Sequence, residues 1–265
     1  MTVSAEQTAD FIYQARLAGT VVDALPESVQ PVDIVEAYAA QAALVELLVA
    51  GGAGSAVGYK VGCTNETAMD LLGADGPFFG QLLAGSVYAS GATVSLDKAG
   101  SLAVEPEYAY VVGAAMGPRA EPYDAESVVP YLSALLPSIE LVGGRFSDIT
   151  AAGIPSIVAD NALNAGWVAG SQKTEDWHQL EIADIEVGLY VDDTQLATGS
   201  ATNVLGHPLN VVAWLANELN ARGSQLGRGD YVTTGTCTAV ERVNPGSTVR
   251  CDFGPLGSVS VQLGV

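Results

Sequence analysis

The segment VEPEYAYVV, residues 104–112, places two glutamates in an otherwise apolar run. As a strand, it would direct residues i and i+2 to one face, so Glu105 and Glu107 would lie side by side. Pro106 cannot donate a ladder hydrogen bond, which predicts a sheet edge or a bulge at this point. Two neighbouring carboxylates leading into an apolar strand repel each other and resist desolvation, so they need a cation or a shared proton.

A third acid, Glu140, stands alone in the apolar segment LLPSIELV, residues 135–142. Three glutamates offer only oxygen donors, which suits Mg²⁺ or Mn²⁺ better than Zn²⁺. Three protein ligands also leave positions open for a chelating substrate. The alternative is that Glu105 and Glu107 form a solvated strand face and that Glu140 is a salt-bridge partner.

The fold class predicted around these acids is α+β, mostly β. Residues 1–55 are predicted to form a helical N-terminal arm and residues 56–265 a catalytic domain, because short glycine-punctuated runs begin after residue 55. The expected strands are 56–62, 102–113, 137–143, 184–191, 230–235, 247–253 and 257–263. The expected helices are 4–18, 32–50, 65–72, 124–136 and 208–222.

Composition excludes several classes of partner. The chain has 265 residues, 49% of them hydrophobic, and a formal charge of −20, so no basic surface for a nucleic acid or an anionic membrane is expected. No apolar run reaches the roughly 18 residues needed to span a bilayer. The N-terminus lacks the apolar core of a signal peptide, and the three cysteines lack metal or disulfide spacing. These features predict a cytoplasmic protein with reduced thiols.

One basic residue, Lys60, lies between two glycines in the expected strand GYKVG, residues 58–62. Flanking glycines remove competing side chains and let a ligand approach. Lys60 near a metal would orient a substrate carboxylate, or transfer a proton if its pKa were depressed. The alternative is an edge lysine that discourages aggregation.

An ordered set of motifs runs through nearly the whole chain. It comprises GYKVG (58–62), PFFG (77–80), EPE (105–107), ELVGGR (140–145), VADNA (158–162), LGHPL (205–209), GD (229–230) and TG (234–235). In this order they resemble the 2-keto-4-pentenoate hydratase and 4-oxalocrotonate decarboxylase branch of the fumarylacetoacetate hydrolase superfamily. The resemblance implies a rolled, mixed β-structure.

By this resemblance, Glu105, Glu107 and Glu140 correspond to the ligands of Mg²⁺ or Mn²⁺, and Lys60 to the family's active-site lysine. The implied substrate is a small 2-oxo or 2-hydroxydienoate acid, bound through its 1-carboxylate and 2-oxygen. The implied reaction passes through an enolate or a dienolate. The family also implies a homo-oligomer.

Further residues are assigned by the resemblance to the substrate pocket, each with a structural alternative. Arg145 would fix a carboxylate or pair with an acid, and Asp160 and Asn161 would reach the site or cap a turn. His207 would shape a loop near the pocket. Thr234 and Gly235 end a strand and would offer a backbone N–H to a carboxylate.

Two positions depart from the family's pattern. Phe78 stands where the hydratases usually have an aspartate. The decarboxylases, like this chain, lack that aspartate. Leu163 replaces a serine. Trp214 and Asp230 instead resemble the hydratases. The prediction is therefore a hydratase of a 2-hydroxy-2,4-dienoate, with a decarboxylase as the alternative and a metal-stabilised structural or regulatory protein as the non-enzyme alternative.

Overall fold

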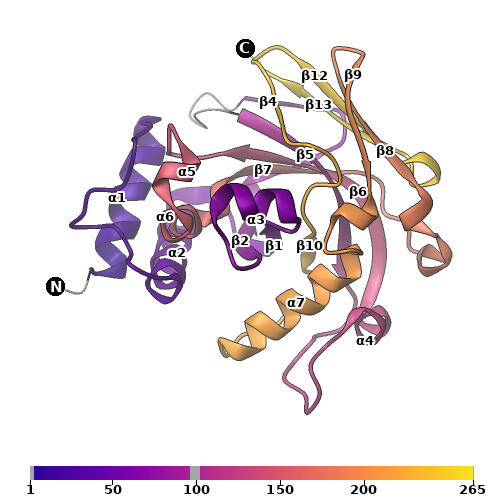
Figure 1. Ribbon diagram of the computed structural model, residues 1–265, viewed down its shortest axis with the longest axis horizontal. Helices are drawn as coiled ribbons and strands as arrows, with labels where there is room; N and C mark the ends of the chain where they lie inside the picture. The colour runs from indigo at the N-terminus through magenta and orange to yellow at the C-terminus, as the bar shows by residue number, and fades with distance from the viewer. Residues whose placement is uncertain (1–2, 96–101, 265) are drawn as a thin grey trace.

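The computed structural model describes residues 3–95 and 102–264, which form two β-sheets and a helical N-terminal arm (Figure 1). The helices are α1 (Ala5–Ala18), α2 (Ile34–Leu48), α3 (Glu66–Leu72), α4 (Ala125–Val128), α5 (Ile149–Ala152), α6 (Ile154–Ala159) and α7 (Pro208–Ala221). The mixed α and β architecture confirms the predicted fold class.

The larger sheet has the strand order β2-β1-β10-β5-β6-β7-β3, with β11 also paired to β5. Its strands are β1 (Ala56–Gly62), β2 (Phe78–Leu83), β3 (Val87–Ala89), β5 (Leu102–Val112), β6 (Leu132–Gly143), β7 (Asn164–Ala169), β10 (Tyr231–Thr233) and β11 (Glu241–Arg242). The smaller sheet has the order β4-β13-β12-β8-β9. Its strands are β4 (Ala92–Val94), β8 (Glu186–Val191), β9 (Thr194–Ser200), β12 (Thr248–Asp252) and β13 (Ser258–Leu263).

The antiparallel pair β5 and β6 is the longest ladder of the larger sheet, running from Leu102 opposite Gly143 to Val112 opposite Leu132. Pro106 lies in the interior of this sheet, so the predicted sheet edge is wrong. The proline is tolerated because the other side of β5 is paired in two pieces, with β10 at residues 109–111 and with β11 at residues 103–104. Pro106 faces the interval between them, where its carbonyl accepts a hydrogen bond from Cys237 N at 2.8 Å.

The helix predicted over residues 124–136 is wrong from Leu132 onward, since α4 continues only as a 3₁₀ turn over Val129–Tyr131. Asp124 caps α4 by accepting a hydrogen bond from Ser127 N, but the helix ends at Val128 and the chain enters β6 at Leu132. Pro130 follows at once, and the next residues pair with β5. Sheet pairing therefore outweighs the local helical pattern. The elements that sequence analysis also missed are β2, β3, β4, β7, β9, β11, α5 and α6.

Two main apolar cores hold these layers together. In one, β5, β6, the smaller sheet and α7 bury residues such as Tyr110, Leu189 and Leu215. In the other, the arm packs against α5 and α6 around Ile12, Leu44 and Ile157. Figure 1 shows α1 and α2 together with α5 and α6 at the end of the molecule away from the smaller sheet.

Helix α2, with its continuation Ile34–Ala53, has the length and hydropathy of a membrane-spanning helix, and 28% of its apolar window is buried within the protein. By length and hydropathy this helix departs from the prediction that no apolar run is long enough to span a bilayer; Glu36, Gln41 and Glu46 interrupt its apolar residues. In the structure α2 packs against α1 and α6.

Gln41 joins the arm to the rest of the molecule. Its buried Nε2 donates to the carbonyl oxygens of Phe79 at 2.9 Å and of Val158 at 2.8 Å, so one side chain links α2, β2 and α6. We expect Gln41→Leu to lower the free energy of unfolding by about 2 kcal/mol, because both buried carbonyls lose their hydrogen bond to this side chain. Urea denaturation checks this, with Gln7→Leu on the exposed face of α1 as the control. Equal midpoints for the two variants would contradict the role of Gln41.

Candidate metal centre

Strands β5 and β6 bring the three predicted glutamates together. Glu105 lies directly opposite Glu140 in the ladder, and Glu107 follows on the same face. One carboxylate oxygen from each of the three residues lies within 4.8 Å of the others. Glu107 and Glu140 are fully buried, so this is not a solvated strand face.

Burial and mutual repulsion disfavour three ionised carboxylates here. Burial, followed by the negative charge of Glu140, raises the pKa of Glu105 to about 7, although Lys60 opposes this shift. The pKa of Glu107 is raised well above its usual value by burial and by Glu140 and Glu105. The cluster is therefore stabilised by protons or by a cation.

Lys60 supplies the nearest positive charge. Its buried Nζ lies 3.1 Å from Glu140 Oε1 and donates a hydrogen bond to the carbonyl of Ala162 at 2.9 Å. Burial by itself would lower the pKa of Lys60, but the three glutamates outweigh burial and raise it. Lys60 is thus held as an ammonium group, and the alternative of an edge lysine does not fit its full burial.

The donor atoms fit a divalent cation. Both oxygens of Glu107 and Oε2 of Glu140 are buried and accept no hydrogen bond of good geometry from the described residues, although the backbone N–H of Gly235 lies near enough to Glu107 to lower its pKa. Native proteins rarely leave buried polar atoms unpaired, so these three oxygens indicate a ligand. An all-oxygen set of carboxylates is suited to a hard cation such as Mg²⁺ or Mn²⁺.

Asn164 is a site residue that sequence analysis missed. Its Nδ2 donates to Glu140 Oε1 at 3.0 Å, so it shares this oxygen with Lys60 and leaves Oε2 free. An asparagine two residues beyond the VADNA motif gave no signal, because the contact depends on the pairing of β7 with β6.

Two more polar groups on the glutamate face were missed. Trp167 is the register partner of Glu140, and Thr233 is the register partner of Lys60. Both are fully buried, and Trp167 Nε1 and Thr233 Oγ1 have no hydrogen-bond partner among the residues described. Only the strand register brings them beside the glutamates.

Phe78 gives the centre an apolar side. A β-carbon on Gly62 would lie 3.2 Å from Phe78 Cε2 and 3.3 Å from Lys60 Nζ, so the ring and the ammonium group meet beside this glycine. Leu163 directly follows Ala162, the acceptor of the Lys60 hydrogen bond, but its buried side chain packs in the core of the arm, where a β-carbon on Gly144 would lie 2.4 Å from Leu163 Cδ2. No proton-transferring side chain stands at position 78.

Asp160 and Asn161 form hydrogen bonds that hold the backbone next to Ala162, the residue bonded to Lys60. Asp160 Oδ1 pairs with Arg16 Nε at 2.7 Å, and its Oδ2 accepts from Arg145 N at 3.0 Å. The Asn161 side chain accepts from Gln81 N at 2.8 Å and donates to Gln81 O at 2.9 Å. Both side chains are therefore engaged with protein groups.

Arg145 is buried, and its Nε and Nη1 have no partner among the described residues. Burial lowers the pKa of the guanidinium and nearby Arg16 adds to this effect, while Asp160 opposes it. Arg145 thus belongs to the neighbourhood of Asp160 and has no bond to the three glutamates.

The remaining predicted residues shape the loops around the centre. His207 caps α7, since its Nδ1 accepts from Leu209 N at 3.1 Å. The hydroxyl and the N–H of Thr234 both donate to Tyr108 O, so that N–H is not available to a substrate. Gly235 has φ +95°, and a β-carbon there would lie 1.9 Å from Thr64 Oγ1.

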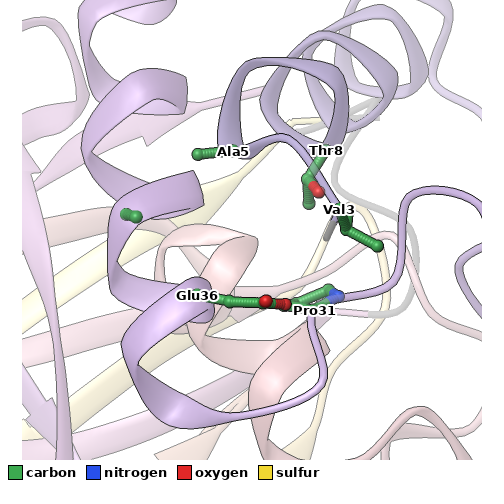
Figure 2. A pocket seen from close by; sticks show the side chains of 6 residues that line it. Val3, Ala5, Thr8, Pro31 and Glu36 are labelled. Atoms are coloured by element: carbon green, nitrogen blue, oxygen red, sulfur yellow. The ribbon is translucent and has the colours of Figure 1, made fainter. Parts of the chain in front are cut away.

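A surface pocket of about 110 Å³ lies elsewhere, between α1 and α2 (Figure 2). It is lined by Val3, Ala5, Thr8, Pro31, Glu36 and Ala39. Glu36 is its only acid, and it holds none of the residues of the glutamate centre, so the chemistry of the chain is to be sought at the buried carboxylates.

Comparison with known proteins agrees with this geometry. Residues 61–263 match the family described as fumarylacetoacetate (FAA) hydrolase C-terminal, so the chain belongs to this family. It is 27% identical over 257 residues to 2-keto-4-pentenoate hydratase of Paraburkholderia xenovorans (strain LB400), covering 97% of this chain and 94% of the relative. It is 30% identical over 246 residues to 2-keto-4-pentenoate hydratase of Burkholderia vietnamiensis (strain G4 / LMG 22486), covering 93% and 92%.

The fold also matches a solved relative of the other activity. The structure of 4-oxalocrotonate decarboxylase from Pseudomonas putida G7, complexed with magnesium and adipate, superposes with a TM-score of 0.89. The two chains are 26% identical, with 98% of this chain and 97% of the other covered. The resemblance seen in the motifs is thereby confirmed, and hydratases and decarboxylases are both among the relatives.

We expect Glu107→Gln and Glu140→Gln each to weaken Mg²⁺ or Mn²⁺ binding more than about 100-fold, because even residues that only orient ligands contribute 10- to 100-fold. Calorimetric titration measures the affinity, with the exposed strand glutamate variant Glu186→Gln as the control. If both variants bind the metal with the affinity of the parent protein, the metal does not bind at these glutamates.

The same titration has a predicted pH dependence. Because the pKa values of Glu105 and Glu107 are raised, the metal-free centre retains protons at and below about pH 7, and a cation must displace them. The affinity for the metal should therefore rise from pH 6 to pH 8. The number of protons released when the metal binds should fall over the same range. A pH-independent affinity would contradict the protonated centre.

Proposed function

We propose that the protein is a divalent-metal-dependent lyase that hydrates a 2-hydroxy-2,4-dienoate to a 4-hydroxy-2-oxo acid. The observation that carries this proposal is the set of three unpaired buried carboxylate oxygens of Glu107 and Glu140 beside the Lys60 ammonium group. The hydratase relatives, which extend over nearly the whole chain, support the choice of reaction.

Under this proposal, Glu105, Glu107 and Glu140 hold Mg²⁺ or Mn²⁺. When bound, the cation supplies electrophilic stabilisation of negative charge on the substrate's 2-oxygen. The chain's own contribution is to fix the donors on two paired strands and to exclude water by burial.

Lys60 is the proposed catalytic residue. Its ammonium group is directed to Glu140 Oε1 and lies beside the oxygens that have no partner, so it can hold and orient the 1-carboxylate of the substrate. The raised pKa keeps the proton at Nζ in the metal-free centre, and this favours orientation over proton abstraction.

The substrate-binding roles assigned from sequence separate into two groups. Phe78 is proposed to contact the substrate's tail, since its ring meets the Lys60 ammonium group beside Gly62, and Leu163, which follows Ala162, is proposed to border the pocket from the side of the arm. For Arg145, Asp160, Asn161, His207, Thr234 and Gly235 we propose indirect roles in shaping the pocket, because the described bonds of these residues are with protein groups.

We propose a homo-oligomer in the cytoplasm that acts on small-molecule acids rather than on a nucleic acid or a membrane. The exposed apolar side chains Val32 (76%), Val35 (67%) and Leu71 (62%) support burial between subunits. The net charge of −20 supports the exclusion of anionic polymers and surfaces.

The function is tested by giving the protein and Mg²⁺ 2-hydroxypenta-2,4-dienoate and, separately, 4-oxalocrotonate. We expect loss of the dienol absorbance with formation of a 4-hydroxy-2-oxo acid. Release of CO₂ from the second substrate would instead establish decarboxylation, the second candidate, which Phe78 and the decarboxylase relatives favour. Turnover of neither substrate by the metal-loaded protein would refute both.

Lys60→Met should lower kcat by about 100-fold, since misplacing the reacting groups by about 1 Å can cost 10²-fold. Metal affinity should be retained or increased, because a positive charge beside the ligands is removed. Steady-state kinetics and calorimetry separate the two effects, and parent-like kcat would assign Lys60 a structural role only.

A further inference from the structure

Residues 160–164, which connect α6 to β7, have an unusual backbone. Asn161, Ala162 and Leu163 have φ values of +51°, +52° and +62°, so three successive residues with a β-carbon lie in the left-handed region. This conformation is unfavourable for such residues and persists only where surrounding bonds impose it. The bonds that impose it come from two sides.

On one side, the 160–164 segment is bonded to the glutamate centre. The carbonyl of Ala162 accepts the hydrogen bond of Lys60 Nζ at 2.9 Å, and Asn164 Nδ2 donates to Glu140 Oε1 at 3.0 Å. The positions of the lysine ammonium group and of one proposed metal ligand are thus tied directly to this segment.

On the other side, the guanidinium of Arg16, in the arm, contacts both ends of the segment. Arg16 Nε pairs with Asp160 Oδ1 at 2.7 Å, and its Nη2 donates to Asp160 O at 2.8 Å. Its Nη1 lies 3.4 Å from the carbonyl oxygen of Asn164. The planar guanidinium has fixed donor directions, so it can set the separation of these two residues in a way that a lysine cannot.

The ion pair between Arg16 and Asp160 is buried deeply enough to contribute to stability. The Asp160 side chain is fully buried and that of Arg16 is 18% exposed, unlike the solvent-screened pairs that contribute little. Arg16 lies outside the matched family region, which begins at residue 61. The contact therefore joins the arm to the catalytic domain at the one segment that also bonds Lys60 and Glu140.

We propose that Arg16 is a positioning residue of the active centre, which fixes the strained 160–164 segment and thereby the places of Lys60 and Glu140. The arm is then part of the machinery that prepares the metal and substrate site. This inference rests on the proposed function for its consequence in turnover. The other part of the inference, that Arg16 controls the conformation of the 160–164 segment and the affinity for the metal, can be measured without any substrate.

The test uses Arg16→Gln in the full chain, with Arg16→Lys as a milder variant. Ile12→Val is the matched control, because Ile12 is fully buried on the same helix one turn earlier and contributes only packing. Three quantities are measured: the Mg²⁺ affinity by calorimetry, amide hydrogen exchange of residues 160–164 in the metal-free protein, and the thermal midpoint.

We expect Arg16→Gln to weaken Mg²⁺ binding by about 10-fold, as for other residues that orient a ligand. Exchange in the segment should accelerate, and Arg16→Lys should be intermediate. Ile12→Val should lower the thermal midpoint without either change. Adding Asp160→Asn to Arg16→Gln should cause little further loss, because the pair with Arg16 is already broken and the amide oxygen of the new side chain can still accept from Arg145 N.

Parent-like affinity and exchange in Arg16→Gln would overturn the proposal, as would an equal loss of affinity in Ile12→Val at a similar thermal midpoint. Should Arg16→Gln not fold, the comparison of Arg16→Lys with Ile12→Val decides in the same way. If the parent binds Mg²⁺ but turns over neither substrate, the proposed function fails while the effect of Arg16 on affinity is still decided. With turnover, kcat of Arg16→Gln should fall more than KM rises.

Discussion

The crowding of three carboxylates in the interior of one sheet is the constraint on which the rest of this structure depends. Glu105 and Glu140 are direct register partners, and Glu107 lies two residues along the same strand. A shift of one residue between β5 and β6 would turn these side chains to the opposite face, into the core that holds Tyr108 and Tyr110. The long ladder between these strands prevents that shift.

The three buried glutamates require compensating partners around them. The protein places a buried lysine and an asparagine on one oxygen of Glu140 and leaves the other oxygen, with both oxygens of Glu107, unpaired. Unpaired buried carboxylates are costly, so the arrangement makes sense as a centre that is completed by a cation. The 160–164 segment, with its strained backbone, is the part of the fold that makes this asymmetric pairing possible.

Much of the centre was predictable because it is local. The i and i+2 spacing of Glu105 and Glu107, and the isolation of Glu140 and Lys60 in apolar strands, are visible in the sequence. The contribution of Asn164, Trp167 and Thr233 was not, because it arises from strand register.

Asp160 shows a different limit of sequence analysis. A polar residue in an apolar stretch was sensibly assigned to either the pocket or a turn, but its partner Arg16 lies 144 residues away. Long-range pairing also explains the wrong helix from Leu132 onward, where a locally helical pattern yields to the ladder with β5. Thus the residue types of the site were predictable, whereas the bonds that orient them depend on the tertiary fold.

The division between hydration and decarboxylation turns on a small part of the site. Both reactions place the same demand on the glutamates, since each develops negative charge on the same end of a 2-oxo acid. What differs is the far end of the substrate, where 4-oxalocrotonate carries a second carboxylate and a simple dienoate carries none. Phe78 offers hydrocarbon next to Lys60, whereas an aspartate at this position would add a negative charge beside the substrate. Phe78 thus lacks the proton expected of a hydratase loop and resembles the decarboxylases at this position, so hydration is placed first because the hydratase relatives extend over nearly the whole chain.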